Sequence, residues 1–447
     1  MTRAASAGAI ALIAALAATS TVSVAGAQSG GGEKRQASEV GVTPKEIRIA
    51  VVADVETSVA PGLFQGAVDG VRGFAKYMNK HGGLAGRKVV VDFIDSKLSA
   101  DEARNAIITA CQEDFAMVGT AALFVNNVDD MASCVDKAGA ATGLPDIPFV
   151  TTEVAHQCNP TTFPMAPPQL ICATKDQHPQ TYQGTAARGL YYKKKFGKDL
   201  HGAYVFGSDL KAARNSSFSS GLGQIRTICC KSDEDFDLSA RSPQSAFTPV
   251  VQALKDKNGS YAQVTGSYNM TVALRKEAKL QGLSSVKVWD CGTQCYDREF
   301  LEQGGADVDG QYVDALYAPF LDPAERKANK IAADYVKFTG EQEAGGLGGA
   351  YAFSAGLALR DAVNSVVEQD GVNGVTRKAV LEQLNSIHEF GADGLLAPID
   401  LAGRKVSNCH VLLQVKDGDF QRIQPKKPGT FHCTKKGTYE VKLDLLT

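Results

Sequence analysis

Short apolar runs alternate with amphipathic segments along most of this chain, and this alternation restricts the fold more than any other feature. A continuous apolar run is typical of a strand buried on both faces, and apolar residues at steps of three and four are typical of a helix. Strand followed by helix, repeated, predicts a parallel sheet with helices on both faces. The predicted strands of the first half are 47–53, 88–94, 116–119 and 147–151, and the predicted helices are 63–78, 99–111 and 128–138.

The alternation stops at residues 153–185, which are rich in proline and show little periodicity, and then starts again. Two sequential doubly wound, Rossmann-like α/β lobes explain this arrangement, and the loops after their strands would face a ligand crevice. An Asp417-Gly418 pair between two apolar runs predicts a hairpin turn. The predicted strands of the second half are 202–206, 225–230, 261–265, 286–289, 311–317, 411–415 and 420–423, and the predicted helices are 211–223, 246–256, 270–281, 324–339 and 347–369.

The first 27 residues predict export. An apolar core at 9–18 follows Arg3, and a small-x-small pattern predicts cleavage after Ala27. A transmembrane anchor is the alternative, but the core is too short to span a bilayer. The first cysteine is Cys111, so we expect no lipid anchor near the cleavage site. Residues 28–44 are polar and glycine-rich, which predicts a flexible leader.

Ten cysteines agree with export, because an even count in an oxidising compartment favours disulfides. Sequence alone allows hundreds of connectivities, but the spacing favours bridges between nearest neighbours. The alternative for Cys291-x-x-x-Cys295 is a metal site, yet zinc needs a second Cys or His pair at short spacing. The expected bridges are Cys111–Cys134, Cys158–Cys172, Cys229–Cys230 (between adjacent residues and therefore the least secure), Cys291–Cys295 and Cys409–Cys433.

Charge and motifs exclude several classes of function. The formal net charge of −2 provides no basic excess for nucleic acid. The chain lacks the G-x-S-x-G, H-E-x-x-H and phosphate-loop motifs, and residues 54–62 lack the glycines that a dinucleotide needs. The seven histidines are scattered, and Lys193-Lys194-Lys195 fits the solvated end of an amphipathic helix better than a phosphate site. We therefore expect a binding protein with no catalytic residues, metal or cofactor.

Several segments, in order and spacing, resemble one known family. No single motif is diagnostic, but together they resemble the branched-chain-amino-acid-type (type I) periplasmic solute-binding proteins of ABC importers, in their actinobacterial form. The resemblance covers residues 45–425, and the Trp289–Cys295 segment and the Cys158–Cys172 pair depart from it. The segments that carry it are 47–50, 70–86 (ending His81-Gly82-Gly83-Leu84-Ala85-Gly86), 143–152, 266–282, 349–359 and 391–423.

The resemblance implies two lobes that close on a small-molecule solute. Three crossovers near 152–156, 290–294 and 390–398 would join them. Such a protein passes its solute to an ABC permease in the membrane, and we expect a monomer that uses no cofactor and binds no nucleic acid. The implied bounds are 45–152 plus 293–392 for lobe one and 153–292 plus 393–447 for lobe two.

The same resemblance implies which residues bind the ligand. Lobe one would use the loop after its first strand, the loop after Gly119, and the end of its fourth strand. Lobe two would use the loops after two of its strands, with two further residues near the crossovers. The implied ligand residues are Thr57, Ser58, Phe64, Ala121, Ala122, Phe124, Thr151, Thr152, Asp209, Tyr268, Asn269, Gln294 and Tyr317.

Two departures bear on the solute. Amino-acid binders of this family commonly hold the ligand carboxylate with a hydroxyl where this chain has Ala121-Ala122, and the ammonium with an acidic group where it has Tyr268-Asn269. An unpaired buried ammonium is costly, so an amino acid would need Asp209. The alternative ligand is an apolar or aromatic acid. A sensor domain of the same fold that signals to a membrane partner, and a secreted enzyme, are the alternatives to a transport protein.

Overall fold

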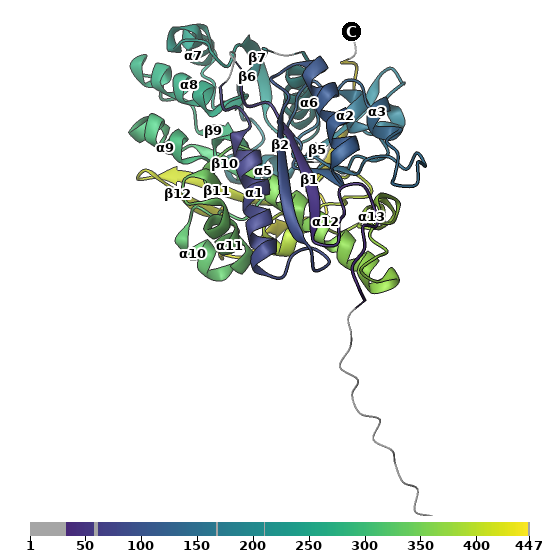
Figure 1. Ribbon diagram of the computed structural model, residues 1–447. Coiled ribbons are helices and arrows are strands. Elements are labelled where there is room, and N and C mark those ends of the chain that lie inside the picture. The colour runs from purple at the N-terminus through teal and green to yellow at the C-terminus, as the bar shows by residue number, and fades with distance from the viewer. Residues whose placement is uncertain (1–32, 58–60, 167–168, 210, 446–447) are drawn as a thin grey trace, which may run out of the picture. The chain divides into compact units, whose positions relative to one another are not determined.

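The computed structural model describes residues 33–57, 61–166, 169–209 and 211–445. The predicted signal peptide, 1–27, lies outside the described residues, as does its cleavage after Ala27. All elements below lie in the compact unit Arg35–Thr447. Its strands form two large sheets with helices on both faces of each (Figure 1). We call the four-stranded sheet and its helices lobe one, and the eight-stranded sheet and its helices lobe two.

Lobe one is built on a parallel sheet of order β2-β1-β3-β4. Alternate residues of β1 point to opposite faces, so Ile49 and Val51 pack toward α1 and α12, and Ala50 and Val52 pack toward α2. Both faces are therefore buried, as the apolar run predicts. The strands are β1 (Glu46–Ala53), β2 (Lys88–Asp95), β3 (Ala116–Val118) and β4 (Asp146–Ile147), and the helices are α1 (Gln65–Lys80), α2 (Ala100–Glu113), α3 (Asp129–Ala132), α10 (Pro323–Ala328), α11 (Lys330–Thr339), α12 (Gly349–Asp370) and α13 (Arg377–Leu384).

Lobe two has the order β12-β11-β10-β9-β8-β6-β7. Strands β6 to β10 are parallel, and the predicted hairpin of β11 and β12 adds antiparallel to β10. Helices α7 and α8 cover one face, and α5 and α6 cover the other. The strands are β6 (His201–Gly207), β7 (Lys231–Leu238), β8 (Tyr261–Thr265), β9 (Val288–Cys291), β10 (Tyr312–Ala315), β11 (Cys409–Lys416), β12 (Asp419–Gln424) and β13 (His432–Cys433), and the helices are α5 (Ala187–Phe196), α6 (Lys211–Thr227), α7 (Thr248–Asp256), α8 (Tyr268–Leu280) and α9 (Arg298–Gly304).

These two sheets confirm the predicted fold class, but one crossover is misplaced. After β9 the chain does not leave lobe two at 290–294; it continues through α9 into β10, which pairs with β9. The chain leaves only after Ala315, so β10 does not belong to lobe one as the predicted bounds had it. The family resemblance implied a crossover at 290–294, but one connecting helix, α9, is enough to bring the chain back as a strand parallel to β9. The other bounds stay predictions.

Three predicted elements of the sheets are also wrong or too long. The helix expected at 128–138 is only Asp129–Ala132, because Asp136 accepts hydrogen bonds from two following backbone amides and turns the chain. The strand at 147–151 is reduced to β4. Residues 225–227 still belong to α6, and the strand is instead the charged segment Lys231–Leu238. That strand pairs with β6 alone, and an edge strand tolerates polar side chains on its free side.

The second half of the predicted leader is ordered rather than flexible. Val42 and Glu39 are buried, and the Glu39 carboxylate accepts hydrogen bonds from the backbone amides of Lys137 and Arg377. The buried Arg87 guanidinium donates to the carbonyl oxygens of residues 36, 43 and 372. These partners come from distant parts of the sequence, so composition alone could not show that residues 36–43 pack against lobe one.

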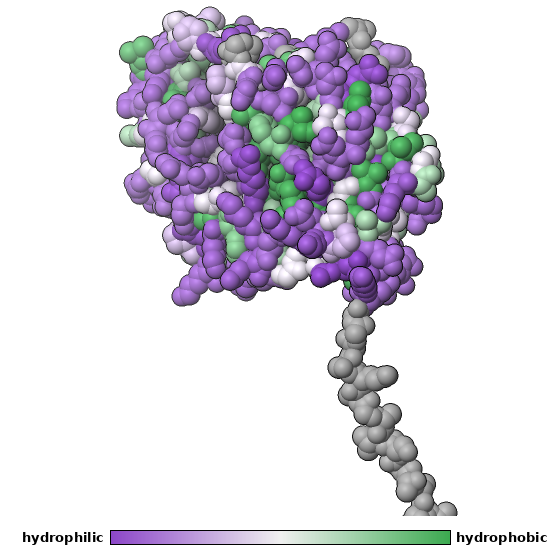
Figure 2. Space-filling model, in the orientation of Figure 1, coloured by the Kyte–Doolittle hydropathy of each residue, from purple (hydrophilic) through white to green (hydrophobic). Residues whose placement is uncertain are grey.

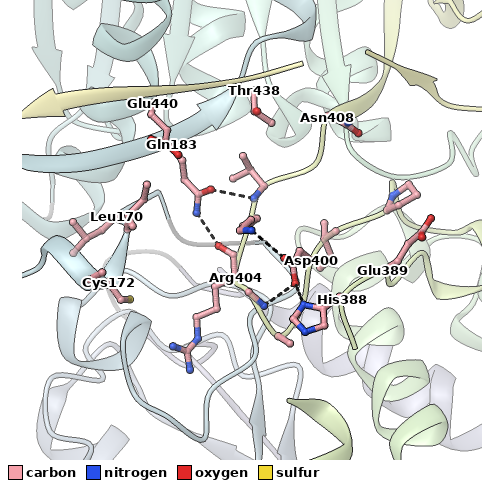
Figure 3. Close-up of a pocket in the computed structure, with 18 of the residues that line it drawn as sticks. Leu170, Cys172, Gln183, His388, Glu389, Asp400, Arg404, Asn408, Thr438 and Glu440 are labelled. Atoms are coloured by element: carbon pink, nitrogen blue, oxygen red, sulfur yellow. Dashed lines mark hydrogen bonds and ion pairs between the residues drawn. The ribbon is translucent and has the colours of Figure 1, made fainter. Parts of the chain in front are cut away.

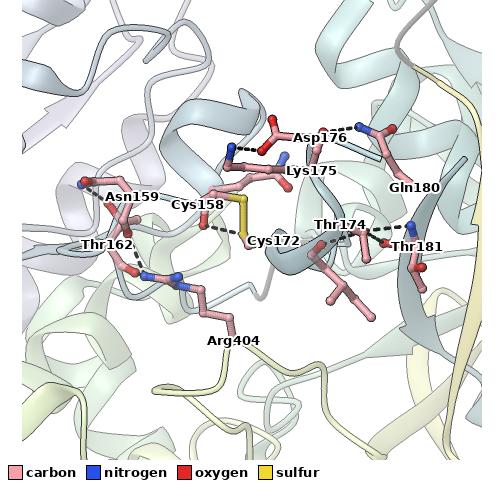
Figure 4. Close-up of a disulfide and its surroundings, with 12 residues drawn as sticks. Cys158, Asn159, Thr162, Cys172, Thr174, Lys175, Asp176, Gln180, Thr181 and Arg404 are labelled. Carbon is pink, nitrogen blue, oxygen red and sulfur yellow. Dashed lines mark hydrogen bonds and ion pairs between the residues drawn. A yellow bond between two sulfur atoms is a disulfide. The ribbon is translucent and has the colours of Figure 1, made fainter. Parts of the chain in front are cut away.

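All five predicted disulfides are confirmed. Cys291 is bonded to Cys295, which removes the proposed metal site, and the described residues contain no group of three metal-ligating side chains. Figure 4 shows the bridge between Cys158 and Cys172 in the segment that joins the two sheets.

A small separate sheet pairs the end of the chain with that same segment. Strand β14 (Thr438–Leu443) runs antiparallel to β5 (Gln180–Thr185), and α4 (Val154–Gln157) precedes β5. Figure 2 shows a mostly hydrophilic face with a hydrophobic area near its centre, where Figure 1 places β1 and the partly exposed edge strand β2. None of the helices in the described ranges has the length and apolar character needed to cross a bilayer.

Candidate functional site

Both sheets have the strand order that places a ligand site at their carboxyl ends. In lobe one, the chain runs from β1 to β2 on one side and then returns to β3 on the other side of β1; in lobe two, it runs from β6 to β7 and then returns to β8 on the other side of β6. Loops that follow the strands on either side of such a switch point form the crevice of doubly wound folds. The predicted ligand loops, at 54–64, 119–124, 208–209 and 266–269, directly follow β1, β3, β6 and β8.

The lobe-one loops are held together by Asp54, which sequence reasoning did not single out. Its buried carboxylate accepts hydrogen bonds from Ser96 Oγ at 2.6 Å, Leu98 N at 2.7 Å and Leu123 N at 2.8 Å. These donors lie in the loops after β2 and β3, so one carboxylate fixes three loops. The signal in the sequence is an acidic residue at the end of an apolar strand, where its charge must find donors.

An aromatic series lines the lobe-one side. The Phe64 ring meets Phe149 edge-on at 5.9 Å, Phe149 stacks on Tyr351 at 5.2 Å, and Tyr351 meets Tyr317 at 5.4 Å between ring centres. The structure thus brings together two predicted ligand residues, Phe64 and Tyr317, through two that were missed. Their contact could not be predicted, because α12 supplies Tyr351 from far along the chain.

Most polar groups of the loop after β3 already have partners. Ala121 N donates to Val52 O, and Thr120 Oγ1 donates to Asp146. The Thr152 hydroxyl donates to Leu123 O. Thr151 differs: its side chain is 6% exposed, and its Oγ1 has no hydrogen-bond partner in the described part of the chain. A buried hydroxyl without a partner is costly, so Thr151 Oγ1 keeps a hydrogen-bonding capacity that the described residues do not use.

On lobe two, Tyr268 lies beside a carboxylate that the sequence did not reveal. Its hydroxyl donates to Glu299 of α9, and burial, followed by the Glu299 interaction, raises the pKa of Tyr268. Asp297, at the start of α9, has a pKa raised to about 6 by burial. The hydroxyl Ser267 Oγ, which precedes α8, has no partner within the described ranges. A carboxylate therefore lies beside Tyr268, although positions 268 and 269 themselves carry none.

The expected role of Asp209 has no support in its contacts. Its carboxylate accepts hydrogen bonds from Ser239 Oγ and Ala240 N, in the loop after β7, and the residue is exposed. Gln294 donates to Val264 O at 3.2 Å, and Tyr317 OH donates to Thr293 O at 3.4 Å. These contacts place Gln294 and Tyr317 next to the ends of β8 and β9.

Two cavities lie along the segments that connect the lobes. Thr152, a predicted ligand residue, lines a cavity of about 250 Å³ together with Glu153, Gln157 and Lys211. A larger cavity, of about 670 Å³, contains none of the predicted ligand residues. Figure 3 shows that Gln183 spans its wall, donating to Arg404 O and accepting from Val406 N.

The predicted ligand residues differ in exposure. Ser58 lies outside the described residues. Asp209 and Asn269 are exposed, and Phe124, Thr152, Tyr268 and Gln294 are half-buried. The buried ones are Thr57, Phe64, Ala121, Ala122, Thr151 and Tyr317.

Comparison with curated proteins found no match. Among solved structures, the chain is similar to a leucine-binding protein, LivK, from Thermotoga maritima (17% identity, TM-score 0.59, 84% of this chain and 97% of that chain covered). It is similar to a fatty acid ABC transporter substrate-binding protein from Thermomonospora curvata (15%, 0.63, 92% and 95%). A third is the branched-chain amino acid transporter substrate-binding protein LivJ from Streptococcus pneumoniae in complex with isoleucine (17%, 0.59, 85% and 100%).

At these identities the solved structures show the fold. The family comparison goes further, because the model described as periplasmic binding protein matches residues 46–419, most of the chain. The chain is therefore a binding protein and not an enzyme, as its lack of catalytic motifs predicts. It belongs to the periplasmic binding protein family.

Proposed function

We propose that this chain is the solute-binding subunit of an ABC importer, and that it traps a small carboxylate-bearing solute by closure of the two lobes. The observation that carries the proposal is Thr151 Oγ1, a buried hydroxyl without a partner among the described residues, in the segment that follows β4 and lies beside the loop after β3. Ala122 N, in the neighbouring loop, likewise has no acceptor among the described residues. A hydroxyl and a backbone amide together suit a carboxylate, which accepts several hydrogen bonds.

The walls support two kinds of carboxylate. The series of Phe64, Phe149 and Tyr351 suits an apolar or aromatic body. Glu299, which holds the Tyr268 hydroxyl, could accept an ammonium and so permit an amino acid. We further propose export with cleavage after Ala27, no lipid anchor, a monomeric state and a permease partner in the membrane.

Thermal unfolding of the oxidised chain from Gln28 tests the proposal across amino acids, aliphatic and aromatic carboxylates, and sugars. A ligand at 100 times its Kd adds about 2.7 kcal/mol of stability, which for a chain of this size shifts Tm by about 3 °C. Small-angle scattering with the best ligand should show a smaller radius of gyration. Binding confined to sugars, or identical dimensions with and without a bound acid, would contradict the proposal.

Glu299→Gln then separates the two kinds of solute. If the ligand is an amino acid, this variant should bind it about tenfold more weakly, since an ammonium loses a charged partner. If the ligand has no amine, the variant should bind it equally well. Glu368→Gln is the control, because Glu368 is an exposed glutamate on another helix, α12.

A further inference from the structure

A cavity of about 420 Å³ lies on lobe two, between α5 and the segment that carries β12 and β13. None of the predicted ligand residues lines it, so it is a separate feature from the crevice. The triple-lysine motif of the sequence contributes to it. The side chains that matter are Leu190, Tyr191, Lys194 and Lys195 from α5, and His432 and Thr434 from the opposite wall.

One ammonium of this cavity is held in place by neutral groups only. Lys195 Nζ donates to Tyr312 OH at 2.9 Å. It also lies 5.1 Å from the ring centre of Phe196 and 5.5 Å from those of Tyr191 and Tyr312. Cation–π and hydroxyl contacts orient an ammonium without neutralising its charge.

The walls carry no compensating negative charge. The sequence contains no Asp or Glu from 187 to 198 or from 421 to 439, whereas the second stretch holds Lys426, Lys427, Lys435 and Lys436. Within the described ranges, neither these four lysines nor the three of the motif at 193–195 form an ion pair. All the lysine ion pairs found there involve other lysines. Lys194 and Lys195, which line the cavity and form no ion pair within the described ranges, create a positive local potential.

His432 is positioned rather than free. Strand β13 pairs with β11, the Cys409–Cys433 bridge fixes the same register, and the His432 ring lies 5.8 Å from that of His410. Burial, followed by His410 and Lys194, lowers the pKa of His432. Burial and the two neighbouring bases therefore disfavour a protonated His432, and an anion in the cavity would oppose this effect.

Lysines in the last turn of a helix also stabilise its carbonyl end, and this role alone would explain the motif as a solvated helix face. It does not explain why the lysines face a cavity whose other wall offers an imidazole and a hydroxyl. We propose that this cavity binds a phosphate group, with Lys194, Lys195 and His432 around the anion and the apolar part of the ligand against Leu190 and Tyr191. Several cations without counter-ions suit an anion, and lysine is a common phosphate ligand.

Phenyl phosphate and phosphatidylglycerol vesicles are the two probes, because the phosphate could belong to a soluble molecule or to a lipid headgroup. Calorimetry with phenyl phosphate and vesicle flotation, each at low ionic strength, use the whole chain from Gln28. Lys194→Gln should weaken binding of the active probe about tenfold, since it removes one charged contact. Lys255→Gln is the matched control: Lys255 is exposed, lies in the last turn of α7 in the same lobe, and lines none of the cavities described above.

Binding of phenyl phosphate would identify a soluble ligand. Flotation with phosphatidylglycerol but not phosphatidylcholine vesicles would identify a lipid headgroup. Either result supports the site if Lys194→Gln weakens the binding. The site is refuted if neither probe binds, or if Lys194→Gln and Lys255→Gln weaken binding equally. His432→Gln provides a second test from the opposite wall. Unchanged Tm values would show that each variant is folded.

Discussion

Replacing Thr151 by valine should strengthen the unliganded protein and weaken its ligand binding. Valine has nearly the shape of threonine but no hydroxyl. Because Thr151 Oγ1 is buried without a partner, its removal relieves a desolvation cost of about 1–3 kcal/mol. At roughly 2.1 cal/mol/K of unfolding entropy per residue, 1 kcal/mol corresponds to about 1 °C for this chain. Tm of the unliganded variant should therefore rise by about 1–3 °C.

The effect on binding should have the opposite sign. A hydrogen bond from a hydroxyl to a charged ligand contributes about 1.5–3 kcal/mol, so its loss weakens binding of the acid found in the panel by about 10- to 100-fold. Calorimetry measures this change, and scanning calorimetry measures Tm. The two readouts together separate a ligand group from a packing group, which would change stability alone.

Thr142 supplies a matched control in the same lobe. Its Oγ1 is also buried without a partner among the described residues, but it lies in the turn between α3 and β4 and not in a ligand loop. Thr142→Val should raise Tm by a similar amount and leave binding unchanged. A fall in Tm for Thr151→Val, or equal binding by the two variants, would refute the assignment of Thr151 to the ligand site.

Three further changes test the contribution of a buried arginine, a buried carboxyl group and a disulfide to stability. Arg377→Met should lower the free energy of unfolding, measured by urea denaturation, by about 3–5 kcal/mol, because the buried guanidinium donates hydrogen bonds to several carbonyl oxygens. Arg241→Met, at an exposed position, should have little effect. Burial raises the pKa of Asp297 to about 6 in the folded protein, so its contribution to the free energy of unfolding falls as pH rises from about 4 to 6. Asp297→Asn should therefore flatten the dependence of the unfolding free energy on pH in this range. An unchanged dependence would contradict the burial of Asp297. The double variant Cys158→Ser, Cys172→Ser opens a loop between residues 14 positions apart and should lower the free energy of unfolding by about 3 kcal/mol. Removing the bridge between the adjacent residues Cys229 and Cys230 should cost less. Equal losses would argue against the loop-entropy explanation.

Local patterns in the sequence were sufficient for the parts of the fold that depend on neighbours along the chain. The apolar run of β1 predicts a strand buried on both faces, and short cysteine spacings predict the bridges. Strand β7 was missed because its pattern is polar: it lies at a sheet edge, and the order of strands is a property of the whole sheet. The second crossover was misplaced for the same reason, since only the pairing of β10 with β9 shows where the chain leaves lobe two.

The candidate site likewise has a part that the sequence predicts and a part that it does not. The loops that face the crevice follow from strand ends and from the family resemblance, but their internal contacts join residues far apart in sequence. Asp54 binds donors 42 to 69 positions away, and Tyr351 reaches Phe149 from α12. The carboxylate beside Tyr268 comes from the next helix, α9. Side-chain identity at a loop position therefore could not show whether a polar group is free for a ligand or already bonded within the protein.

The covalent bridges bear on whether the lobes can move. Cys111–Cys134 lies within lobe one, Cys158–Cys172 lies within the first connecting segment, and the other three bridges lie within lobe two. No bridge in the described part of the chain ties one lobe to the other. Hydrogen bonds such as those of Gln183 with Arg404 O and Val406 N join the connecting segments, and each contributes only about 1 kcal/mol. The disulfides therefore stiffen each part separately, and none of those in the described residues opposes the relative motion of the lobes that ligand-driven closure requires.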